Sequence, residues 1–182
     1  MNMQGIPLNL IHVYVGIPLF AYLAIHGLVF SKNRNNIATR YISIGAVFFL
    51  LAALLYAIPV LFTHESATLT LTTIAGDTMQ YASLLCVWLL AAQLLLSRWK
   101  IAFVIANILA CTLTMATIGV SIRENLAAPA HVVITDSTLQ LELVSSPSYN
   151  FWNGLMFMSL LVVGVSFLLQ VPQAERKSQK YR

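Results

Sequence analysis

The stretch YISIGAVFFLLAALLYAIPVLF, residues 41–62, decides the fold because it contains no charged residue and is long enough to cross a lipid bilayer. A transmembrane helix needs about 20 mostly apolar residues to span the hydrocarbon core. Four other stretches have the same character, and they cover residues 6–30, 78–96, 101–122 and 151–171. The sequence therefore predicts an all-α integral membrane protein, with five transmembrane helices in a single membrane domain over residues 1–182.

The composition excludes an ordinary soluble domain. Of the 182 residues, 59% are apolar and only 9% are charged, whereas soluble domains have about a quarter of their residues charged. The net charge of +4 lies in short clusters between apolar stretches, so we expect it to set topology rather than to bind nucleic acid directly. Cys86 and Cys111 lie inside apolar stretches, where buried free thiols are a better expectation than a disulfide.

The basic residues predict which way the chain crosses the membrane. All but Arg123 lie in the first connection, the third connection or the C-terminal segment, at Lys32, Arg34, Arg40, Arg98, Lys100, Arg176, Lys177, Lys180 and Arg182. Because basic segments stay in the cytoplasm, the N-terminus is expected outside and the basic tail, residues 172–182, inside. Six of these residues are candidates for contact with a cytoplasmic partner, namely Arg34, Arg40, Arg98, Lys100, Arg176 and Lys177.

The two outer connections, about 63–77 and 123–150, are expected to form an exoplasmic cap. Apolar and polar residues alternate in 67–73 and in 138–144, as in a half-buried strand. We therefore expect a small β-hairpin from about residue 131 to 144, joined into a sheet by a strand from the second connection. Its apolar side would consist of Ile134, Leu139, Leu141 and Leu143. An irregular loop at the headgroups is the alternative.

Three histidines are candidate cofactor ligands. His12 and His26 share one face of the first predicted span, about 21 Å apart along a helix axis, and His64 could pair with His12. Imidazole is an axial ligand of b-type haem, so the three residues would serve a haem b site. The competing interpretation is that the histidines face the bundle and form hydrogen bonds there.

The fourth predicted span has a polar stripe at helical spacing. Its members are Asn107, Cys111, Thr114, Thr117 and Ser121, and Gln93 on the third span could reach Asn107. Small and hydroxyl side chains allow membrane helices to approach closely, so packing is the favoured role. On that basis Asn107→Leu should weaken the bundle, whereas a ligand pathway lined by the stripe is the alternative.

The expected function follows from what the spans lack. No Asp, Glu, Lys or Arg lies in the middle of a predicted span, which disfavours proton-coupled carriers. No nucleophile–base arrangement, metal cluster or phosphate loop occurs, so we do not expect an enzyme. We expect a scaffold or sensor subunit of a bacterial inner membrane that assembles with itself or other subunits and engages a cytoplasmic protein. The alternatives are a haem- or quinone-binding anchor of a respiratory complex and a small homo-oligomeric channel.

Overall fold

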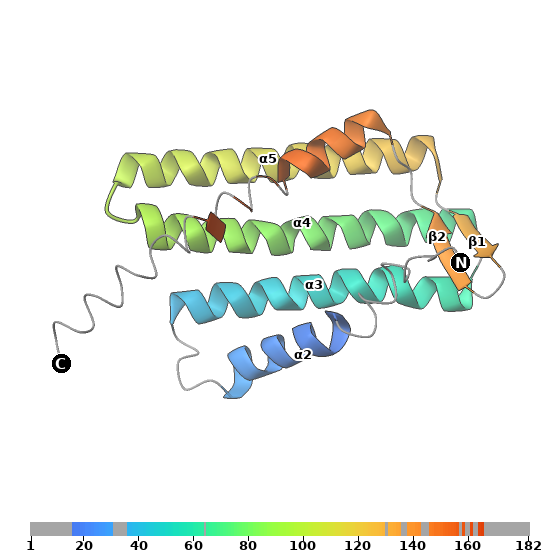
Figure 1. The fold of residues 1–182 in the computed structure, drawn as a ribbon, viewed down its shortest axis with the longest axis horizontal. Helices are drawn as coiled ribbons and strands as arrows, with labels where there is room; N and C mark the ends of the chain where they lie inside the picture. Colours follow the sequence, from blue (N-terminus) through green and yellow to red (C-terminus); the bar gives the residue numbers. More distant parts are fainter. Residues whose placement is uncertain are drawn as a thin grey trace, which may run out of the picture.

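The fold is a bundle of long helices with a small hairpin at one end (Figure 1). The computed structural model describes residues 16–30, 36–63, 65–129, 131–135, 138–142, 146–156, 158, 161, 164 and 165. The elements are α2 (Ile17–Ile25), the π-helix η2 (His26–Phe30), α3 (Ile37–Phe62), α4 (Ser66–Leu96), α5 (Lys100–Ala127), β1 (His131–Thr135) and β2 (Thr138–Glu142). Residues 147–156 form a further helix after the hairpin.

Short connections make α3, α4 and α5 antiparallel neighbours. The side chain of Asn36 accepts a hydrogen bond from the amide of Ala38 at 2.9 Å and caps the start of α3. The turn between α4 and α5 closes through a 2.8 Å hydrogen bond from Trp99 N to the Leu96 carbonyl. So short a link forces the two helices to pack side by side, and α2 lies against α3 in turn.

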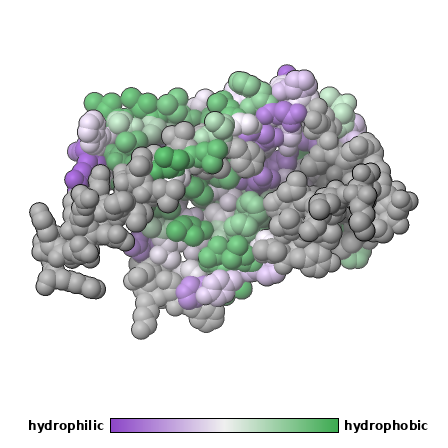
Figure 2. Space-filling view, in the orientation of Figure 1, coloured by the Kyte–Doolittle hydropathy of each residue, from purple (hydrophilic) through white to green (hydrophobic). Residues whose placement is uncertain are grey.

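Three of the helices are long and apolar enough to cross a membrane: Ile37–Pro59 within α3, and all of α4 and α5. Most of the large apolar side chains of α5 point outward, and Leu109 and Met115 are 63% and 69% exposed. Figure 2 shows hydrophobic residues spread along much of the α5 side of the molecule. This outside-apolar pattern suits a helix that faces lipid.

The core between the helices contains many small residues. Buried positions on α3 and α4 include Ser43, Ala46, Ala52, Ala53, Ser83, Ala91 and Ala92. Membrane helices gain little from burying large apolar side chains against each other, so close backbone approach supplies the van der Waals contact. The core is therefore rich in small and polar residues, with a few large side chains such as Leu69 and Tyr81, while many large apolar residues face outward.

Helix α4 corrects two predictions. It begins at Ser66 rather than at residue 78, so the strand predicted over 67–73 and most of the cap predicted over 63–77 are helical. Alternating threonines suggested a strand, but a threonine hydroxyl can bond back along its own helix. Thr72 Oγ1 does so, donating to the Thr68 carbonyl at 3.1 Å and to the Leu69 carbonyl at 3.0 Å.

The predicted hairpin range contains two paired strands. β1 and β2 are antiparallel, with Val132 opposite Leu141 and Ile134 opposite Leu139. β1 contacts α4 and β2 contacts α3, so the hairpin lies at the end of the bundle where α3 ends and α4 begins. Leu143 lies outside the described residues.

The first and fifth predicted spans are described only in part. Within 6–30, the described apolar helix is Ile17–Val29, shorter than a full crossing. Within 151–171, helix is described to residue 156 and at a few positions beyond it. The structure therefore provides three candidate spans.

Candidate functional site

The site centres on the side chain of Asp77, which is 3% exposed and lies inside α4. Its Oδ1 accepts a hydrogen bond from the hydroxyl of Tyr56 on α3. Its Oδ2 accepts from the hydroxyl of Ser121 and from Nδ2 of Asn125 at 3.4 Å, both on α5, and from the hydroxyl of Tyr149 at 3.2 Å. One carboxylate thus joins α4 to α3, α5 and helix 147–156.

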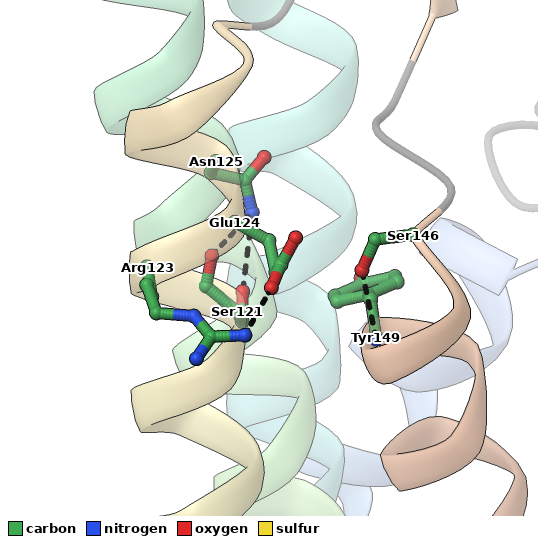
Figure 3. Close-up of polar contacts among 6 residues, drawn as sticks. All are labelled: Ser121, Arg123, Glu124, Asn125, Ser146 and Tyr149. Atoms are coloured by element: carbon green, nitrogen blue, oxygen red, sulfur yellow. Dashed lines mark hydrogen bonds and ion pairs between the residues drawn. The ribbon is translucent and has the colours of Figure 1, made fainter.

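Neighbouring residues place the first three donors. A Cβ atom at Gly76 would lie 2.9 Å from Cε1 of Tyr56, so the absence of a side chain at Gly76 lets the Tyr56 ring lie against α4. Ser121 and Asn125 are one turn apart on the same face of α5. Nδ2 of Asn125 also donates to the Ser121 carbonyl at 2.9 Å and to its Oγ at 3.2 Å (Figure 3).

The fourth donor comes from the helix that follows the hairpin. Oγ of Ser146 accepts a hydrogen bond from the amide of Tyr149 at 3.0 Å and caps the start of this helix. Figure 3 shows the Tyr149 ring directed toward α5. One turn later Asn153 accepts a hydrogen bond from the hydroxyl of Tyr81 on α4, and Met156 is fully buried. One face of helix 147–156 therefore binds α4 at two levels.

Among the described residues, the four groups that donate to Asp77 are uncharged. An ionised carboxylate only accepts hydrogen bonds and offers about four lone-pair directions, so these contacts serve an ionised Asp77. The nearest charged residues along α5, Arg123 and Glu124, form an ion pair with each other at 2.5 Å (Figure 3). An ionisable group inside a membrane bundle is costly and is by default a functional-site candidate.

The predicted polar stripe lies partly in this site. Ser121 bonds Asp77, while the hydroxyls of Thr114 and Thr117 are buried and donate to carbonyls one turn earlier on α5, at 2.8 Å each. Asn107 Oδ1 is buried and accepts no hydrogen bond from the described residues, so its expected bond with Gln93 is not formed through this atom. Both cysteines are free, Cys86 buried as expected but Cys111 exposed.

Of the three candidate cofactor ligands, only His26 is among the described residues. His26 is exposed, and its ring stacks on that of Tyr22 with centroids 5.3 Å apart. His12 and His64 lie outside the described residues, as do Arg34, Arg176 and Lys177. Among the described residues no group of three His, Cys, Asp or Glu side chains could hold a metal ion. Arg40, Arg98 and Lys100 are exposed, at or near the end of the bundle opposite the hairpin.

The sequence pattern missed the residue at the centre of the site. Asp77 seemed to flank a connection because α4 was expected to begin after it, whereas Asp77 lies inside α4, which is itself a candidate span. One signal was present: Asn125 continues the polar stripe one turn beyond Ser121. Tyr56 and Tyr149 give no local signal, because only packing brings them to Asp77.

We expect Tyr149→Phe to weaken the bundle by roughly 0.6 kcal/mol, up to about 1.7, because one hydrogen bond to the carboxylate is lost. Thermal unfolding in mild detergent measures this loss. Tyr22→Phe is the matched control, since Tyr22 is exposed and lies away from Asp77. Equal stability of the two variants would show that the Tyr149 contact contributes nothing.

Asn107→Leu should leave the stability unchanged or raise it, contrary to the expectation from the sequence. A buried acceptor without a partner costs about 1–3 kcal/mol, and leucine removes that cost without leaving a donor unpaired. The same unfolding measurement tests it. A lower unfolding temperature for Asn107→Leu would show that the amide has a partner that stabilises the fold.

The comparisons with known proteins add no assignment. No protein-family model matches the chain, and no curated protein or solved structure matches it. A role for Asp77 therefore has to follow from its own contacts and chemistry.

Proposed function

We propose that this chain is a non-enzymatic, multi-pass membrane protein that acts as a sensor or scaffold subunit. In this proposal the hairpin receives a signal on the outer side, and the opposite end of the bundle engages a cytoplasmic protein. The chain would work in a bacterial inner membrane, with further copies of itself or with other subunits. The observation that carries the proposal is the attachment of both ends of the hairpin to Asp77.

The attachment has a simple geometry. The chain enters the hairpin from α5, where Ser121 and Asn125 bind Asp77, and leaves it into helix 147–156, where Tyr149 binds the same carboxylate. The strands themselves contact α3 and α4. A displacement of the hairpin therefore acts on contacts inside the bundle, which is the connection that a membrane sensor needs.

The proposed topology has five crossings, with the N-terminus outside and the C-terminus in the cytoplasm. Arg98 and Lys100 lie at the turn between α4 and α5, and Arg40 lies near the start of α3, so these basic residues share one end of the bundle. Each basic residue held near an anionic leaflet contributes about 1 kcal/mol. The hairpin, at the opposite end, would then face outward.

Fusion of a reporter that is active only outside the cytoplasm tests this topology. The reporter should be active after Glu65 or Asp136 and silent after Arg34 or Arg182, because basic segments are retained inside. The same four fusions to a cytoplasm-active reporter are the control. The reverse pattern would place the hairpin in the cytoplasm and remove the proposed division of roles.

Charge reversal tests the cytoplasmic contact. In the double variant Arg98→Glu, Lys100→Glu, we expect the amount of partner protein that co-purifies in mild detergent to fall at least about tenfold. Charge reversal at such a contact costs several kcal/mol. Arg123→Glu is the matched control, because Arg123 is exposed at the hairpin end of α5. Membrane abundance of each variant is measured alongside. If the control loses the partner equally, or if the double variant retains it, the cytoplasmic role is wrong.

A further inference from the structure

We propose that Asp77 is a reversible proton-binding site, and that its protonation releases helix 147–156 and the hairpin. A proton is thereby named as a ligand of the proposed sensor. The release of the hairpin rests on the proposed function. Four observations carry it: a buried carboxylate bonded to neutral donors among the described residues, the direct contact of these donors with its oxygens, a second acceptor beside Tyr56, and an uncommitted hydroxyl at Thr73.

Burial and direct donor contacts favour a proton as the ligand of Asp77. Asp77, Ser121 and Tyr81 are 3%, 1% and 2% exposed, and the donors contact the carboxylate directly. A metal cation would need several oxygen ligands arranged around its own volume, and an organic cation would need a pocket. A proton adds no volume, so it can neutralise the carboxylate without rearranging the helices first.

The hydroxyl of Tyr56 has two acceptors within reach. The Tyr56 hydroxyl donates to Oδ1 of Asp77, and Oε1 of Gln80 lies 3.3 Å from the hydroxyl oxygen of Tyr56. When a hydronium ion from acidic solution gives its proton to Oδ1 and leaves as water, the Tyr56 hydroxyl can rotate its hydrogen to Gln80 and accept the new O–H of Asp77 through its oxygen. The site gains one proton, and no O–H bond of Tyr56 breaks. Each protonation state of Asp77 thus has a hydrogen-bond partner.

Thr73 provides a further uncommitted hydroxyl on the same helix face. It lies one turn before Asp77 and is 1% exposed, and its Oγ1 has no hydrogen-bond partner among the described residues. Thr72 and Thr78, in contrast, both donate to carbonyls of α4. A buried hydroxyl without a partner is costly. Side chains four residues apart on a helix are neighbours, so a rearranged Asp77 would be within reach of the Thr73 hydroxyl.

Protonation should weaken the longest contacts first. Hydrogen bonds to an ionised acceptor are about twice as strong as neutral ones, and the contacts from Tyr149 and Asn125 to Oδ2 are already 3.2 Å and 3.4 Å long. Their loss would release the Tyr149 end of helix 147–156 from Asp77 and leave Ser121 as the contact from α5. Among the described side chains, the titratable groups facing Asp77 are Tyr56 on α3, Tyr149 on helix 147–156 and Tyr81 on α4 itself. The charged pair Arg123 and Glu124 lies on α5.

Infrared difference spectroscopy of the full chain in liposomes tests proton binding directly. Acidification should produce the carbonyl band of a protonated carboxyl group, reversibly, and Asp77→Asn should abolish it. Glu65→Gln is the matched control, since Glu65 is an exposed acid at the start of α4, and it should keep the band. In Gln80→Leu, half of the band should appear only at an about threefold higher proton concentration than in the wild type. The reason is that the protonated arrangement loses one hydrogen bond of roughly 0.6 kcal/mol.

Amide hydrogen exchange of residues 131–142, corrected for the intrinsic effect of pH, reports the release. Acid should speed exchange in the wild type and in Glu65→Gln, whereas Asp77→Asn should exchange rapidly at every pH. No reversible band in the wild type, or a band that survives Asp77→Asn, would overturn the proton site. It would leave the cytoplasmic partner test, and so the proposed function, unaffected. A band without any change in exchange would overturn the release of the hairpin.

Discussion

The hydrogen bonding of one buried carboxylate constrains the whole bundle. In a lipid-facing fold no water replaces the hydration that Asp77 loses, so its oxygens must find donors within the protein. The donors come from α3, α5 and helix 147–156, which are far apart in sequence from residue 77. Satisfying this side chain therefore fixes which helices surround α4 and at what level they meet it.

Small residues make that arrangement sterically accessible. Gly76 leaves room for the ring of Tyr56 beside α4, and alanines and serines line the contact between α3 and α4. Had larger side chains filled these positions, the helices would stand further apart and the donors would not reach the carboxylate. The polar site and the small-residue core thus depend on each other, while large apolar side chains such as Leu109 remain at the lipid-facing surface.

Hydropathy predicted the helical segments that are continuously apolar. It missed the start of α4, where hydroxyl side chains form hydrogen bonds within the helix. The apolar run 41–62 lies within α3, and 101–122 lies within α5. The start of α4 was missed because threonines lower the hydropathy and alternate like strand residues, although their hydroxyls bond within the helix. That error moved Asp77 out of the span. The helical period nevertheless predicted Ser121, since a buried polar face repeats regardless of what it contacts. Tyr56 and Tyr149 depend on packing between distant segments.

The hairpin lies between two helices that both contact Asp77. A hairpin attached at one end could move while the bundle stayed fixed, as a flexible appendage does. Here α5 and helix 147–156 both contact the same carboxylate, so the two helices that flank the hairpin are joined through Asp77. A shift of either flanking helix would therefore act on the Asp77 contacts. Because packed cores favour discrete arrangements over continuous deformation, the proposed protonation of Asp77 would be coupled to the position of the hairpin, and each would then influence the other.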